Sequence, residues 1–103
     1  MESIAEISDN MECLIDKAEH FAKCAVSKKE SDNSLAEAYY RIANDLLAHV
    51  SLLHTQIVAK IEGYKQTGAE IPKDMQRLYD ILHKKHIEHV ATIKGMLALY
   101  KEM

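Results

Sequence analysis

The stretch LAEAYYRIANDLLAHVSLLHTQIVAKI, residues 35–61, decides the fold class because its apolar residues recur every three or four positions. That spacing is typical of an amphipathic helix. Two neighbouring stripes can be followed along it. The first consists of Leu35, Tyr39, Ile42, Leu46, His49 and Leu53, and the second of Ala43, Leu47, Val50, His54, Ile57 and Ile61. Two adjacent stripes predict a central helix that packs against other helices on both sides.

The segments before and after this helix show the same periodicity. Residues 2–28 carry an apolar stripe made of Ile4, Ile7, Met11, Leu14, Ala18, Phe21 and Ala25. Residues 72–102 carry a stripe made of Met75, Leu78, Leu82, His86, His89, Ile93, Met96 and Tyr100. The sequence therefore predicts one helix on each side of the central helix.

Local signals set the bounds of the central helix at about residues 34–67. Ser34 followed by Glu37 has the form of a capping box, which marks a helix start. Gly68 is typical of a helix end, and Pro72 suits the first turn of the next helix. Because the connections are short, we predict three long antiparallel helices, arranged as an up-down-up bundle or as a helical hairpin with a third helix added.

Composition supports a single all-α domain over residues 1–103. The chain is 48% apolar and holds only 3 glycines and 1 proline, a mixture that favours long helices. A net charge of −3 argues against nucleic-acid binding, which needs a concentrated positive surface. The longest apolar runs are far too short to span a bilayer. An acidic amino-terminal segment and two cysteines too far apart on one helix for a disulfide predict a cytoplasmic protein.

The long stripes also bear on assembly. A heptad-like stripe looks the same whether its partner helix lies in the same chain or in another copy. We therefore expect a homo-oligomer, in which helices of several copies complete a four-helix arrangement.

Histidine is the one residue type that suggests chemistry. The chain has six histidines, and four of them (His49, His54, His86 and His89) lie on or beside the apolar stripes. Several pairs with carboxylates or with one another are three or four residues apart, so each pair projects from one helix face. The candidate metal ligands are Glu19, Asp45, His49, His54, His83, His86 and His89, with Glu12 as a further candidate. Imidazole with carboxylate suits iron, manganese or zinc without choosing among them. In an alternative reading, these histidines only hydrogen-bond to neighbouring groups or face solvent.

Two resemblances extend this reading. The stretch AYYRIANDLLAHVSLLHTQIVAKIEGY is similar to the metal-bearing helix of ferritin-like and rubrerythrin-like proteins, with His49 at the histidine of the Glu-x-x-His motif. Leu46 stands at the motif's glutamate, Asp45 lies one position away, and Glu19 best matches the first-helix carboxylate. Over residues 15–101 the chain also resembles short helical proteins encoded in prophage regions of gut Firmicutes, which implies a bacterial or phage origin and leaves the mechanism open.

Three functions are compatible with these observations. The first is a non-enzymatic assembly or interaction protein, with the resemblance above pointing to a phage association, because no complete catalytic motif is present in the sequence. The second is a ferritin-like protein with a His/carboxylate metal site formed between helices or subunits. The third is a pH-responsive switch, in which buried neutral histidines must become charged as the pH falls through about 6.

Overall fold

The computed structural model describes the backbone of residues 4–103 and the side chains of residues 6–103. Its elements in chain order are α1 (Ile4–Lys28), α2 (Asn33–Thr67), α3 (Lys73–Ile81), the π-helical turn η1 (Leu82–His86) and α4 (Ile87–Glu102). Strands are absent from this part of the chain. The predicted all-α class is confirmed, and the third predicted helix is the continuous run of α3, η1 and α4.

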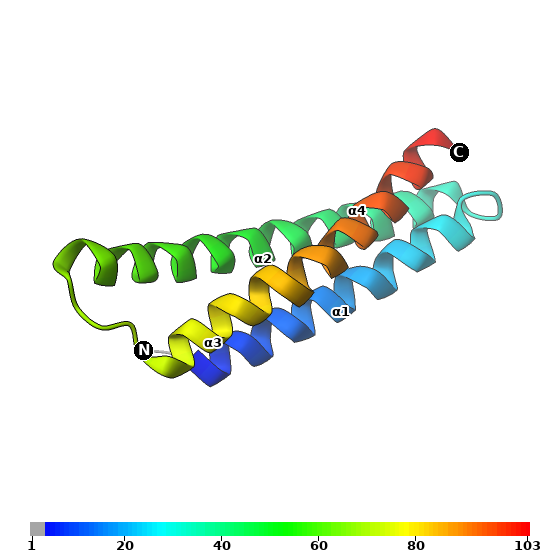
Figure 1. Ribbon diagram of the computed structural model, residues 1–103. Coiled ribbons are helices and arrows are strands. Elements are labelled where there is room, and N and C mark those ends of the chain that lie inside the picture. The colour runs from blue at the N-terminus through cyan, green and yellow to red at the C-terminus, as the bar shows by residue number, and fades with distance from the viewer. Residues whose placement is uncertain (1–3) are drawn as a thin grey trace.

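The three helical stretches form an elongated bundle. In Figure 1, α1 and α2 make an antiparallel hairpin, and α3 and α4 return alongside α1 in the same direction as α1. The molecule measures 56 × 24 × 17 Å and has a radius of gyration of 16.2 Å. A compact domain of this length has a radius of gyration of about 13 Å. The predicted up-down-up order of the helices is confirmed.

The two stripes of residues 35–61 predict that α2 is the central helix. In the structure the central helix is α1, so this prediction is wrong. The backbone of α4 lies mainly against α1, and α4 reaches α2 through Tyr100, whose ring stacks on Tyr40 with centroids 4.7 Å apart. The cause lies in the small side chains of α1, because Ala18, Ala22 and Ala25 are all fully buried. Without large side chains in the way, the backbones of α2 and α4 can both approach α1 closely.

The ends of α2 follow from local chemistry, with one correction. The side chain of Asp32 accepts a hydrogen bond from the backbone N–H of Leu35 (3.1 Å), so Asp32 caps the helix and not the predicted Ser34. Glu37 pairs instead with Arg41, one turn further on (3.3 Å). Asp32 is the earlier of two good capping residues, and the helix begins directly after it. Gly68 ends α2 as predicted, with φ 71° in the left-handed region that glycine adopts without strain.

The two stripes of α2 have different environments. The second stripe is buried except for a half-buried His54, and it packs into the core with α1. In the first stripe, Leu35, Ile42 and His49 are exposed and the other members are half-buried. Leu14 and Phe21 of α1 flank it and are also half-buried. We call these residues together the open face: Leu14, Phe21, Leu35, Tyr39, Ile42, Leu46, His49 and Leu53.

The inner face of the third helical stretch matches the prediction. Each residue of its predicted stripe is buried or half-buried. The π-helical turn η1 begins at Leu82 and ends at His86, both of which are buried. No helix among residues 4–103 combines the length and the apolar character that crossing a membrane requires.

Candidate functional site

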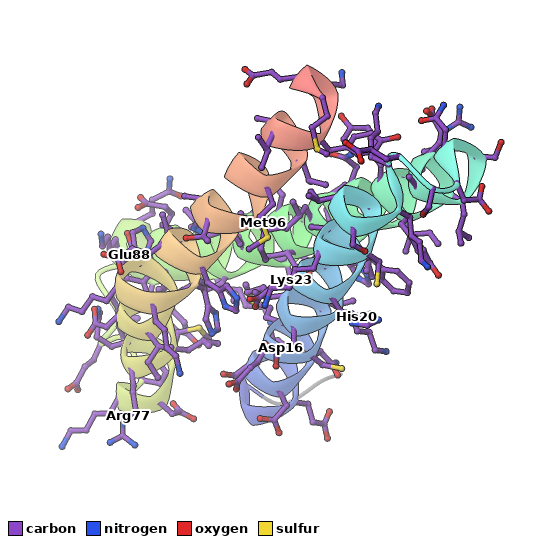
Figure 2. The ribbon with its side chains drawn as sticks, turned by 90° about the vertical axis from the view of Figure 1, so that its right-hand side faces the viewer. Asp16, His20, Lys23, Arg77, Glu88 and Met96 are labelled. Atoms are coloured by element: carbon purple, nitrogen blue, oxygen red, sulfur yellow. The ribbon has the colours of Figure 1, made fainter. Side chains whose placement is uncertain are left out.

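The main candidate site lies between α1 and α4. Asp16 and Glu19 are three residues apart on α1, so both project toward the same side of that helix. His89 reaches them from α4, and one ligand atom of each of the three side chains lies within 4.8 Å of the other two. Figure 2 looks onto α1, with Asp16 and Lys23 labelled along it and with α3 and α4 running beside it. The parallel course of α1 and α4 brings the acidic row of one helix to the histidines of the other.

Glu19 is the best-connected member of this cluster. Its Oε2 accepts a hydrogen bond from Nε2 of His89 at 2.6 Å, and its Oε1 pairs with the ammonium group of Lys23 at 3.1 Å. The hydrogen bond with His89, and then the bond with Lys23, lower the pKa of Glu19. The carboxylate is therefore held in its charged form. The His89 and Glu19 side chains are 31% and 28% exposed, so ions in solution can reach them.

His86 lies one helical turn before His89 and is only 5% exposed. None of the described residues offers a hydrogen-bond partner to its Nδ1. Burial lowers the pKa of His86, while the negative charges of Glu12 and Asp16 oppose that change. His86 is therefore a buried imidazole whose neutral form is favoured by burial, and it lies within reach of the charges of Glu12 and Asp16.

A second pair of histidines bridges α2 and the π-helical turn. The rings of His54 and His83 are 5.4 Å apart in an edge-to-face arrangement. Nδ1 of His83 lies 3.1 Å from the backbone carbonyl oxygen of Tyr79, to which it donates a hydrogen bond. Burial, and then the proximity of His83, lower the pKa of His54.

His54 and His86 share a pocket between α2 and α4. Its volume is about 240 Å³, and most of its lining side chains are apolar, including Met11, Val50 and Leu82. The pocket exists because α2 and α4 both pack on α1, while their backbones come close to each other at few positions. Neither histidine has a carboxylate within hydrogen-bond distance among the interactions of the described residues.

The remaining two predicted ligands, Asp45 and His49, lie elsewhere. Both are exposed on α2. His49 borders a pocket of about 250 Å³ on the open face, together with Cys13 and Lys17 of α1. Within the described residues, neither Asp45 nor His49 belongs to the cluster around Glu19.

The structure thus divides the predicted ligands among separate places. Glu19 meets His89, and His54 meets His83, whereas His86 is buried between these two pairs. Asp16 was missed as a candidate, although its spacing of three residues from Glu19 repeats the spacing from His86 to His89. That match could have shown that the two pairs face each other, given parallel helices.

Comparison of the chain with protein-family models, with curated proteins and with solved structures gives no match. The similarity to ferritin-like helices and to prophage-encoded proteins therefore stays a prediction from sequence.

Proposed function

We propose that this protein is a helical assembly protein that associates with a second copy of itself through the open face. The observation that carries this proposal is the first stripe of α2, which has a helix-type apolar pattern but no covering helix in the described chain. Leu35 is 37% exposed and Ile42 is 40% exposed.

The open face is continuous across the α1–α2 hairpin. Phe21 of α1 contacts Tyr39 of α2, with ring centroids 5.8 Å apart. Leu14 and Leu53 lie further along and line the same shallow pocket with His49. These apolar side chains lie on two antiparallel helices, with α3 and α4 covering the other side of α1. A pair of helices with a half-exposed apolar surface is half of a four-helix bundle.

A second copy is the simplest occupant of this face. Two identical faces related by a two-fold axis are self-complementary, and two-fold dimers are the commonest assemblies of soluble proteins. Each hairpin would supply two helices, and the half-exposed side chains of both copies would be buried together. Burial of that apolar area stabilises the dimer by about 25 cal/mol for each Å² removed from water.

Matched charge substitutions test this proposal. Ile42→Glu places a carboxylate on the open face of both copies, where burial without a partner is costly, so it should convert a dimer to a monomer. Leu99→Glu is the control, because Leu99 is 53% exposed but belongs to α4, away from the open face. Ile87→Glu changes the lining of the α2–α4 pocket instead. Size-exclusion chromatography with light scattering measures the mass of each variant.

Three outcomes are informative. A dimer that is lost only in Ile42→Glu supports the proposal. Loss of the dimer only in Ile87→Glu or Leu99→Glu would place the contact on α4 and refute the assignment of the open face. A wild-type monomer across micromolar concentrations would refute self-association itself.

A further inference from the structure

We infer that Asp16, Glu19 and His89 form a binding site for a divalent transition-metal ion, which links α4 to α1. The site is separate from the open face, because its side chains lie where α1 packs against α4. It also differs from the set expected by resemblance to ferritin-like proteins, since it does not include Asp45 or His49.

The geometry suits such an ion after a small movement. Two carboxylates and an imidazole nitrogen lie within 4.8 Å of one another on rigid helices. Zinc bonds to nitrogen and oxygen are about 2.0–2.1 Å long, so neighbouring ligand atoms around a tetrahedral ion are about 3.3 Å apart. Nε2 of His89 and Oε2 of Glu19 are now 2.6 Å apart, so less than about 1 Å of separation is needed. Partly exposed side chains can move that far by rotation, and the exposed Asp16 must approach by at most about 1.5 Å, from 4.8 Å to about 3.3 Å.

The surroundings add a second, independent observation. His86 is nine-tenths buried, its Nδ1 is unpartnered among the described side chains, and it lies one turn from His89, near enough to Glu12 and Asp16 for their charges to act on its pKa. The π-helical turn that ends at His86 directly precedes α4, and such turns are frequent at functional sites. A buried imidazole without a hydrogen-bond partner is unfavourable for stability alone. We infer that this unpartnered imidazole is kept for the neighbouring carboxylate–histidine cluster and not for stability.

In the metal-free state, a shared proton and an ammonium group take the place of the ion among these side chains. The proton between His89 and Glu19 lies where the metal would bind, and the ammonium group of Lys23 occupies the other oxygen of Glu19. Metal binding at Nε2 therefore displaces this proton, which goes to solvent from an imidazolium or to Nδ1 of a neutral ring, and the ion competes with Lys23 for the Glu19 carboxylate. Imidazole in the ligand set favours transition metals over magnesium.

The decisive experiment is calorimetric titration of the full chain, purified without a histidine tag, with Zn²⁺ and Mn²⁺ after treatment with chelator. We expect one saturable site per chain for at least one of the two ions and no competition by Mg²⁺. His89→Gln and Asp16→Asn should each weaken binding by at least about tenfold, the loss that even outer-shell partners of a metal cause. Lys23→Met should strengthen binding, because it removes the competing cation; a merely structural Lys23 would have no such effect.

Two other groups on the protein serve as controls. Sγ of Cys24 lies 3.6 Å from Nε2 of His20 on the exposed side of α1, and this pair offers zinc an alternative site. His83 contacts His54 on the far side of the π-helical turn. Cys24→Ser and His83→Gln should therefore leave the affinity unchanged.

The proposal fails if neither ion shows saturable binding. It also fails if binding is lost in Cys24→Ser or His83→Gln and retained in His89→Gln. Far-UV circular dichroism of each variant confirms that the helices are intact, as expected for substitutions at exposed and half-exposed positions. If the protein binds metal in the titration and its dimer persists in chelator, assembly does not depend on the metal site. Either proposal can then fail without the other.

Discussion

Substitution of His86 by leucine is predicted to stabilise the protein. In the wild type, a ring nitrogen is buried without a hydrogen-bond partner among the described residues, at a position 5% exposed. An unsatisfied buried polar atom costs about 1–3 kcal/mol. Leucine removes that polar atom and places a side chain of similar size beside Met11 and Leu82, which line the same pocket. We therefore expect the free energy of unfolding to rise by about 1–3 kcal/mol at pH 8.

The same substitution should change the pH dependence of stability. Burial lowers the pKa of His86 in the folded state below the ordinary value of 6.5. The carboxylates of Glu12 and Asp16 oppose this change, whereas Lys85 and His89 add to it. Below pH 6.5 the unfolded chain therefore binds more protons at this site than the folded chain. The resulting stability is complete above pH 6.5 and is lost as the pH falls from there through the lowered pKa.

Thermal unfolding in chelator, followed by circular dichroism between pH 8 and pH 5, measures both effects. At pH 8 the midpoint of His86→Leu should lie at least about 4 °C above that of the wild type. Between pH 6.5 and pH 5 the variant should lose less stability than the wild type. His86→Leu should still lose some stability over this range, because burial also lowers the pKa of His54. The double variant with His54→Leu should not show this remaining loss. A midpoint lower than that of the wild type at pH 8 would refute the reasoning, since it would mean that Nδ1 makes a stabilising bond.

Three further substitutions test the fold. Ala22→Leu introduces a large side chain at a fully buried position of α1 and should lower the free energy of unfolding by about 1–3 kcal/mol in urea titrations. Ala48→Leu, at an exposed position, should leave the free energy of unfolding nearly unchanged. Equal effects at both sites would contradict the central position of α1. Asp32→Ala removes the cap of α2 and should lower the free energy of unfolding by about 1 kcal/mol, whereas Asp32→Asn should retain most of that stability. An unchanged stability in Asp32→Ala would refute the assigned cap. Gly68→Ala forces a side chain into a left-handed conformation and should cost about 1–2 kcal/mol, an effect that unchanged stability would exclude.

Much of the fold could be read from the sequence because helix periodicity is a local property. The stripe from Met75 to Tyr100 is buried or half-buried at each position, and Gly68 ends α2 where expected. What could not be read was the choice of central helix. Periodicity shows which face of a helix is apolar but not how closely another helix can approach it. That approach depends on Ala18 and Ala22, whose small size appears as a weak apolar signal in the sequence.

The candidate site was predictable in part. His54 and His83 are both among the predicted ligands, and the structure brings their rings together. The contact between Glu19 and His89 joins residues 70 positions apart, and it depends on how α4 lies along α1. An error of one turn in that alignment would exchange the partners of each carboxylate. The π-helical turn before α4 shifts this alignment further, and nothing in the local sequence marks it.

We propose above that two copies of the chain associate through the open face. Sedimentation equilibrium of the wild-type chain, in chelator and without a tag, tests it most directly. The account predicts a mass of twice 11.7 kDa at micromolar concentration, and a mass of 11.7 kDa for Ile42→Glu under the same conditions. A wild-type mass of 11.7 kDa at every concentration, or a dimer that Ile42→Glu leaves intact, would contradict it.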